Sequence, residues 1–163
     1  EAKRFVVSLL EKEGAHALAP TLDPRFAQTQ DFRSNWSERH VAFIAGLGTF
    51  GLSRGLITAK GIAGRFGSVV TDLTIAVTAR PYKDPFEYCL FLSGKAECNA
   101  CQERCPAGAI SREGKSHPPC SDYLRSPDLL KDVRAKFGYT YSGCGKCQTA
   151  VPCEDRIPGM ARP

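Results

Sequence analysis

Two stretches of the chain repeat apolar side chains at helical spacing. Residues 3–13 (KRFVVSLLEKE) carry their Phe, Val and Leu side chains toward one side, and Gly14 follows them, so the pattern predicts an amphipathic helix. A second helix is expected from about residue 38 to residue 46. Ser37 is a favourable N-cap for it, and Glu38 places a negative charge in its first turn. The residues between the two helices show little periodicity, and we expect them to be mostly loop.

Extended structure is predicted in two places. Residues 54–58 (RGLIT) are expected to form a short strand. Residues 67–79 (GSVVTDLTIAVTA) carry the strongest strand signal of the chain, because β-branched and apolar side chains dominate them. The Arg-Pro-Tyr sequence at residues 80–82 ends this run.

The composition of the chain changes near residue 83. Predicted helices and strands precede this point, whereas Gly, Pro and Cys dominate from residue 84 onward. We therefore expect an α+β protein in two parts, residues 1–83 and residues 84–163.

Composition and charge indicate which classes of binding partner to expect. The chain has 163 residues, 42% of them hydrophobic, which is enough to bury a core. No apolar run reaches the roughly 18 residues that indicate a membrane span, and the start has no secretory pattern, so we expect a cytoplasmic protein without a membrane partner. The formal charge of +5 comes from Lys and Arg scattered singly, so a nucleic-acid partner is not expected. The sequence begins at Glu1 instead of Met, and we expect either that an upstream segment is missing or that the start was processed.

The chemistry of the chain is concentrated in its cysteines. All eight lie between residues 89 and 153, and the first 88 residues contain none. Disulfides in small secreted domains are spread over the whole fold, whereas a dense group with Cys-x2-Cys pairs is typical of metal sites. The cysteines therefore predict metal binding.

The central motif is Cys98-x2-Cys101-x3-Cys105-Pro106. It matches the last three cysteines of the C-x2-C-x2-C-x3-C-P run of bacterial ferredoxins, whose fourth cysteine binds the other cluster. The first cysteine of that run would fall at Lys95, which cannot replace a thiolate on iron. Cys89 lies nine residues before Cys98 and is the expected substitute.

A second group, Cys144-x2-Cys147-x5-Cys153 with Cys120 upstream, departs from the ferredoxin spacing. The two sulfurs of each Cys-x2-Cys turn are expected to bind the same cluster. The last cysteine of each group, Cys105 or Cys153, is then expected to bind the cluster of the other group. This logic predicts two 4Fe-4S clusters close together. Cluster I takes Cys89, Cys98, Cys101 and Cys153, and cluster II takes Cys105, Cys120, Cys144 and Cys147. Two zinc sites of four cysteines each are the alternative, although zinc ribbons lack the C-x2-C-x3-C-P run.

A glycine-rich stretch, Gly46-Leu47-Gly48-Thr49-Phe50-Gly51, has the formal GxGxxG pattern of dinucleotide-binding proteins. In those proteins the glycines open a helix, whereas here a predicted helix precedes them. We interpret the stretch as a turn, or as backbone that approaches some other flat cofactor. No arrangement of Ser, His, Asp or Cys indicates a catalytic residue.

Several stretches together resemble the epoxyqueuosine reductase-like iron–sulfur proteins, which are related to the cobalamin-dependent reductive dehalogenases. The resemblance covers about residues 37 to 159 and is carried by SERHVAFIAGLGTFGLSRGLIT, FGSVVTDL, CNACQERCPAGAI, CSDYL and SGCGKCQTAVPCEDRIPG. Lys95 in place of the first ferredoxin cysteine, and the ending CQTAVPCE, depart from the family pattern and suggest a separate branch.

The resemblance implies a partial nitroreductase-like α/β unit over residues 1–83 and a two-cluster ferredoxin-like module over residues 84–163. In that family the first domain holds a corrinoid, so Gly46, Leu47 and Gly48 are expected near such a cofactor. The family's catalytic acid lies in an N-terminal part that these residues lack, so cobalamin binding is expected only of a longer form. The function implied is electron transfer to a redox partner. A non-redox protein with structural metal sites and a stand-alone ferredoxin with two clusters are the alternatives.

Overall fold

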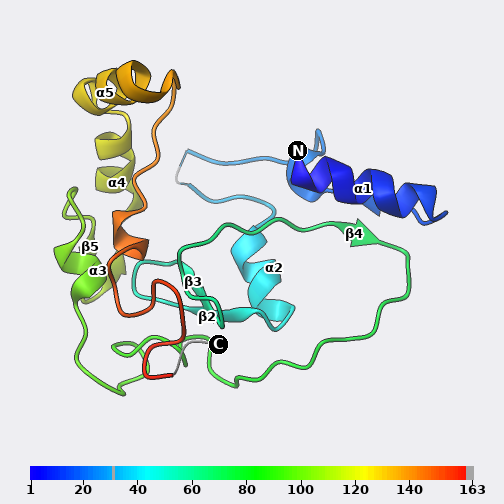
Figure 1. Cartoon of the computed structure of the whole chain (residues 1–163), viewed down its shortest axis with the longest axis horizontal. Coiled ribbons are helices and arrows are strands. Elements are labelled where there is room, and N and C mark those ends of the chain that lie inside the picture. Colours follow the sequence, from blue (N-terminus) through cyan, green and yellow to red (C-terminus); the bar gives the residue numbers. More distant parts are fainter. Residues whose placement is uncertain (31, 161–163) are drawn as a thin grey trace. The chain divides into compact units, whose positions relative to one another are not determined.

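The structure is a computed structural model that describes residues 1–30 and 32–160 (Figure 1). Its elements are short helices and three two-stranded antiparallel sheets, a mixed α and β composition. The chain divides into two compact units. Unit 1 comprises residues 1–47 and 64–81, and unit 2 comprises residues 48–63 and 82–163. The change of composition near residue 83 lies close to residue 82, where the second stretch of unit 2 begins. Unit 2 also includes residues 48–63, which precede that change.

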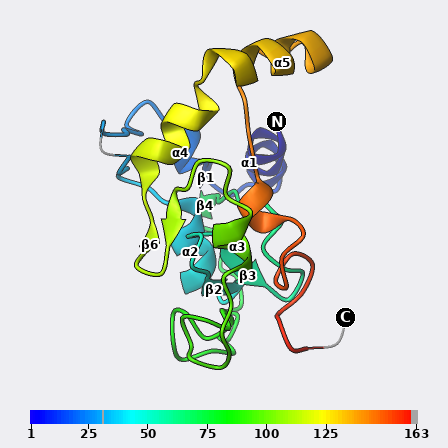
Figure 2. The same ribbon diagram turned by 90° about the vertical axis from the view of Figure 1, so that its left-hand side faces the viewer.

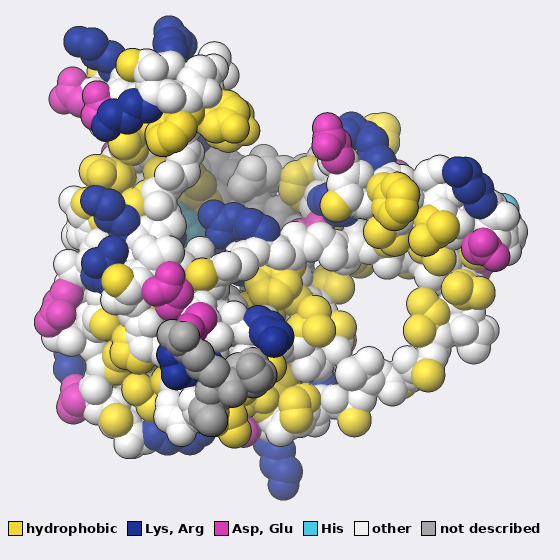
Figure 3. Space-filling view, in the orientation of Figure 1, with side chains coloured by type: hydrophobic (Ala, Val, Ile, Leu, Met, Phe, Trp, Pro, Cys, Tyr) yellow, Lys and Arg dark blue, Asp and Glu magenta, His cyan; other side chains and the backbone are white. Residues whose placement is uncertain are grey.

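Unit 1 contains both predicted helices. Helix α1 runs over Ala2–Lys12 and α2 over Glu38–Ile44, and between them lie the strand β1 (Ala17–Leu18) and the 3-10 helix η1 (Pro20–Leu22). The two helix predictions are confirmed to within two residues at each end. Hydrophobic side chains gather along α1 in the space-filling view (Figure 3), and Phe5 at 70% and Leu9 at 48% are exposed.

The carboxylate of Glu38 holds the elements of unit 1 together. It accepts hydrogen bonds from Lys3 Nζ at 3.1 Å, Thr21 Oγ1 at 3.0 Å and Ser68 Oγ at 2.5 Å. Ser68 in turn accepts a hydrogen bond from Trp36 Nε1 at 2.9 Å. Burial alone would raise the pKa of Glu38, but the hydrogen bonds from Ser68, Lys3 and Thr21 outweigh it and hold that pKa below its usual value.

The long strand predicted over residues 67–79 is wrong. Only β4 (Val70–Thr71) is extended and paired, and its partner β1 offers just two residues, Ala17 opposite Thr71 and Leu18 opposite Val70. Beyond β4 the side chains are exposed, Ile75 at 64% and Val77 at 96%. β-Branched residues favour a strand when a neighbouring strand and a packed face are present, and this segment has only the short edge of β1.

Unit 2 begins with a hairpin. Strands β2 (Gly48–Phe50) and β3 (Leu56–Thr58) pair antiparallel, with Thr49 opposite Ile57, so the strand predicted over residues 54–58 is confirmed for its last three residues. The loop joining β2 to β3 carries Leu52, and Ile62 follows the hairpin. These two side chains and Ile57 pack against Cys89, Ile110 and Val151 in the core of the unit.

The remaining elements of unit 2 are short. They are the helix α3 (Ala100–Glu103), the hairpin of β5 (Ile110–Ser111) and β6 (Gly114–Lys115), the helices α4 (His117–Leu124) and α5 (Pro127–Phe137), and the 3-10 helix η2 (Lys146–Gln148). Helix α5 follows α4 after a bend at Ser126 and Pro127 (Figure 2). The longest helices of the described residues have 11 residues, and none is long and apolar enough to cross a membrane.

Candidate metal centre

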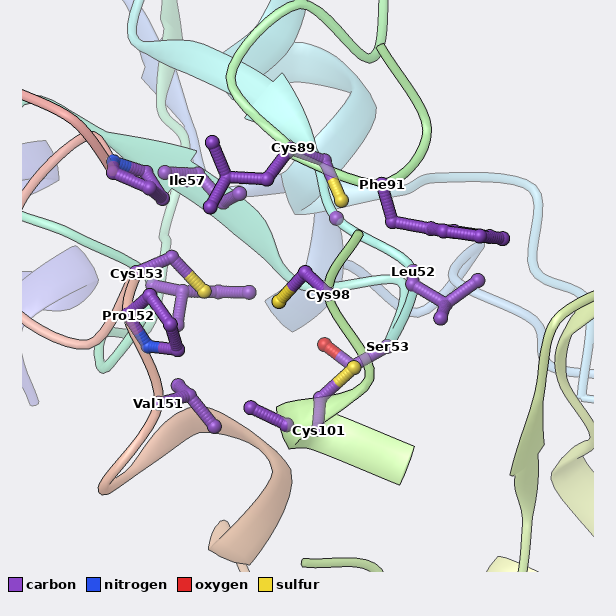
Figure 4. Close-up of a pocket in the computed structure, with 15 residues that line it drawn as sticks. Leu52, Ser53, Ile57, Cys89, Phe91, Cys98, Cys101, Val151, Pro152 and Cys153 are labelled. Atoms are coloured by element: carbon purple, nitrogen blue, oxygen red, sulfur yellow. The ribbon is translucent and has the colours of Figure 1, made fainter. Parts of the chain in front are cut away.

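A pocket in unit 2 is lined by four cysteines, Cys89, Cys98, Cys101 and Cys153. Figure 4 shows their sulfur atoms turned toward the same space. The pocket contains about 400 Å³ of empty space, part of it open to solvent, and the rest of its wall is mostly apolar. These are the four cysteines assigned above to cluster I. Three of them lie within residues 89–101, and Cys153 is more than fifty residues further along the chain.

The first of these cysteines, Cys89, is 8% exposed and lies in a series of tight turns. Its N–H donates to the Phe86 carbonyl at 2.9 Å, and its own carbonyl accepts from the Ser93 N–H at 3.0 Å. Lys95, at the position of the usual first ligand, is exposed, and its ammonium donates a 2.7 Å hydrogen bond to the Glu87 carbonyl. The turns therefore direct Cys89, and not Lys95, into the pocket.

Cys98 precedes α3, and Cys101 is the second residue of that helix. Asn99 is the N-cap of this helix, so the two cysteines are separated by the turn that begins it. A spacing of three residues places side chains on the same side of a helical turn, which brings both thiols to one wall of the pocket.

Cys153 is held in place by the chain that follows β3. The N–H of Ile62 donates to the Cys153 carbonyl at 2.8 Å, and the N–H of Ala63 donates to the Glu154 carbonyl at 3.1 Å. Gly61 makes this approach possible. Its φ is +84°, and a Cβ at this position would lie 2.1 Å from the Glu154 carbonyl oxygen. Only glycine allows the two backbones to come this close.

The thiols of the pocket are close enough to affect one another's ionisation. The pKa of Cys153 is raised to about 12, chiefly by burial and also by the neighbouring thiols of Cys89, Cys101 and Cys98. Burial likewise raises the pKa of Cys101 to about 11, with contributions from Cys89, Cys98 and Cys147. Thiolates at Cys101 and Cys153 would therefore need a compensating positive charge, which is what iron or zinc supplies to a cysteine site.

A second group of thiols lies around η2. Burial raises the pKa of Cys147, the thiols of Cys144 and Cys105 add to the effect, and the ammonium of Lys115 opposes it. The guanidinium Nε of Arg104, next to Cys105, donates to the Lys146 carbonyl at 3.2 Å and so joins the end of α3 to η2. Cys105 Sγ also accepts a hydrogen bond from the Ala109 N–H at 3.2 Å.

Cys120 is the remaining cysteine of predicted cluster II. It is half-buried in the middle of α4. The hydroxyl of Ser142 donates to the Leu124 carbonyl, so the chain leading to Cys144 runs beside the end of that helix, one turn beyond Cys120. Its part as the fourth ligand stays a prediction.

The eight cysteines all lie in the described part of the chain, and each carries a free thiol. Within residues 1–30 and 32–160, no three His, Cys, Asp or Glu side chains are grouped so as to hold a metal ion. A single zinc would require four thiolates about 2.3 Å from one atom. In a 4Fe-4S cubane each thiolate binds a different iron, so its four thiolates would surround a space instead of meeting at one atom.

The glycines of the GxGxxG stretch have structural roles of their own. Gly46, with φ +82°, ends α2: its N–H donates to Phe43 at 3.1 Å, and the Leu47 N–H donates to Ala42 at 3.0 Å. This pair of bonds is the Schellman motif of helix ends. A Cβ at Gly48 would lie 2.1 Å from the Ile57 carbonyl oxygen across the hairpin. The stretch thus closes a helix and opens a strand, and a corrinoid near Gly46, Leu47 and Gly48 stays a prediction.

The rest of the pocket wall was not among the predicted site residues, and one polar side chain stands out in it. Ser53, in the loop between β2 and β3, is 4% exposed and lines the pocket beside the cysteines (Figure 4). The sequence offers no signal for it beyond a small polar residue between Leu52 and Arg54.

Compared with known protein families, with curated proteins and with solved structures, the chain gives no match in any of the three comparisons.

Proposed function

We propose that this chain transfers electrons through two 4Fe-4S clusters, as the redox module of an epoxyqueuosine reductase-like protein. The observation that carries the proposal is the pocket lined by Cys89, Cys98, Cys101 and Cys153. The cysteine spacing and its likeness to the ferredoxin motif had grouped these four, and the wall around them is mostly apolar.

The second group of thiols supports a relay of two clusters. Cys101 belongs to the pocket and Cys105 to the group with Cys144 and Cys147, and the short helix α3 joins them. Four residues along a helix correspond to about 6 Å of rise, so clusters held by these two cysteines would lie close together. Electrons pass readily between centres at such a separation, and a redox partner must supply or accept them.

Metal analysis of anaerobically prepared protein tests this proposal. Two cubanes require about eight iron and about eight acid-labile sulfide per chain. The protein should be brown, and its broad visible absorption should bleach with dithionite. A colourless protein with stoichiometric zinc and no sulfide would contradict the proposal and support structural metal sites. A brown protein whose clusters cannot be reduced would contradict the electron-transfer part alone.

Cobalamin enters the proposal only for a longer form of the protein, on the resemblance described above. Titration with cobalamin, followed by its visible spectrum, should show tight binding by a form with an additional N-terminal part and weak or no binding by these 163 residues. Absence of binding by the longer form would remove the corrinoid from the proposal and leave the clusters untouched.

A further inference from the structure

Ser53 has a polar atom that the described residues leave without a partner. Its side-chain Oγ is buried and forms no hydrogen bond within the described part of the chain, and the residue is only 4% exposed. Buried hydroxyl groups are nearly always hydrogen-bonded, because an unpaired one has lost its water without replacement. The exception at Ser53 therefore indicates a partner that is not a protein atom.

The hairpin loop fixes where this hydroxyl lies. The Gly51 N–H donates to the Gly55 carbonyl and the Arg54 N–H to the Gly51 carbonyl, each at 2.8 Å, and Arg54 has φ +61°. A turn followed by a left-handed residue is the usual form of a three-residue hairpin loop. A Cβ on Gly55 would lie 2.7 Å from the Ile62 side chain and 2.8 Å from Gln148 Nε2, so the loop is packed tightly in place.

The space that the hydroxyl faces is the cysteine pocket. Ser53 lines this pocket together with Cys98 and Cys101, and Figure 4 shows its oxygen turned toward the space that the sulfur atoms face. A trapped water is a poor partner here, because a buried water needs two to four polar contacts and most of the other lining side chains are apolar, among them Ile57, Phe91 and Val151. The four cysteine sulfur atoms are the most numerous hydrogen-bond acceptors among the side chains that line this pocket.

We propose that the Ser53 hydroxyl donates a hydrogen bond to a sulfur of cluster I, either a cysteine thiolate or an inorganic sulfide, and so raises the reduction potential of that cluster. The proposal rests on the proposed function, since it requires a cluster in the pocket. The oxidised cluster accepts one electron from the redox partner, no bond is made or broken, and the proton stays on the serine oxygen. Because reduction adds negative charge to the sulfurs, a donor aimed at them stabilises the reduced form more than the oxidised one.

The test compares Ser53→Ala with the wild-type protein and with Ser53→Thr, which keeps a hydroxyl. Ser111→Ala is the matched control, since Ser111 is an exposed serine in β5 of the same unit and has its own partner, Glu113. Each protein is assayed for iron and sulfide and then titrated to its two midpoint potentials, with the reduced clusters followed by electron paramagnetic resonance. Electron–nuclear double resonance in D₂O counts exchangeable deuterons coupled to the cluster.

We expect Ser53→Ala to keep its iron and sulfide, to lower one midpoint potential, to leave the other unchanged and to lose one exchangeable coupling. Ser53→Thr should restore the potential at least partly, and Ser111→Ala should match the wild type. Unchanged potentials at full iron content would overturn the hydrogen bond and leave the proposed function standing. Loss of iron from Ser53→Ala would also overturn it, by making the serine a ligand or a structural residue. Wild-type protein without iron or sulfide would instead refute the proposed function itself.

Discussion

The backbone N–H of Ile62 donates a 2.8 Å hydrogen bond to the carbonyl of Cys153, and this bond anchors the last cysteine to the chain that leaves the β2–β3 hairpin. Residues 48–63, which precede all the cysteines in the sequence, therefore form part of unit 2 and hold Cys153 in place.

Gly61→Ala should release Cys153 from the pocket. The added Cβ would meet the Glu154 carbonyl oxygen at 2.1 Å, and φ of +84° strains any other residue. We expect iron to fall from about eight to about four per chain, because one of two cubanes is lost. The control is Gly64→Ala, whose Cβ would meet nothing within 4 Å. Full iron content in Gly61→Ala would show that Cys153 is not needed for the cluster.

Removal of single cysteines should separate the two clusters. Cys153→Ala should damage the cluster bound by Cys98 and Cys101, and Cys105→Ala should damage the cluster bound by Cys144 and Cys147. Each variant should keep about four iron, with the surviving cluster identified by its electron paramagnetic resonance spectrum. If Cys153→Ala and Cys147→Ala removed the same cluster, the assignment across the two groups would be wrong.

Cys89 and Lys95 should respond differently to substitution. Cys89→Ser should lower the iron content or convert one cluster to a three-iron form, because a thiol that faces the pocket is lost. Lys95→Ala should leave the iron content unchanged, because the ammonium is exposed and bonded to the Glu87 carbonyl. Iron analysis of the two variants side by side distinguishes them. Equal iron in Cys89→Ser and the wild type would leave Cys89 as a packing residue.

The metal-free protein should lose stability as the pH rises above about 9. The pKa of Cys101 is raised to about 11 and that of Cys153 to about 12 from an ordinary value of 9.0, chiefly by burial. Between pH 9 and these values the unfolded state gives up thiol protons that the folded state keeps, so alkali favours unfolding. Below pH 9 both states are protonated, and the contribution is fully present.

The measurement is the urea midpoint of the metal-free protein at several pH values from 8 to 10.5. The double variant Cys101→Ala, Cys153→Ala should show a shallower decline with pH than the wild type. Parallel declines in the two proteins would mean that these thiols do not have raised pKa values. The same thiols must be deprotonated to bind metal, so cluster loading should improve over this pH range.

The two helices near the start could be predicted because local pattern decides them. Ser37 and Glu38 mark the start of α2, and Gly46 ends it through its left-handed conformation. The strand over residues 67–79 failed for the opposite reason, since its pairing depends on a neighbour that no local pattern reveals. β1 supplies only two paired residues to it.

The spacing of the cysteines predicted which four share the pocket. It did not predict which other residues form the pocket wall. The hairpin that carries Ser53 lies far from the cysteines in the sequence, and its composition resembles that of any buried turn. Likewise, a glycine is required at position 61 because the backbone of Glu154, about ninety residues later in the sequence, lies against it. Contacts of this kind depend on tertiary structure, so reasoning from one sequence could not find them.

The four pocket cysteines span residues 89 to 153, and all four cysteines of proposed cluster II lie inside that interval: Cys105, Cys120, Cys144 and Cys147. During synthesis on the ribosome the inner group therefore emerges before the outer one is whole. In the proposed assignment, cluster II can be inserted into the growing chain while cluster I still awaits its last thiolate. A chain cut short between Cys147 and Cys153 would keep all four cysteines of proposed cluster II and only three of proposed cluster I, so we expect it to bind a single cluster.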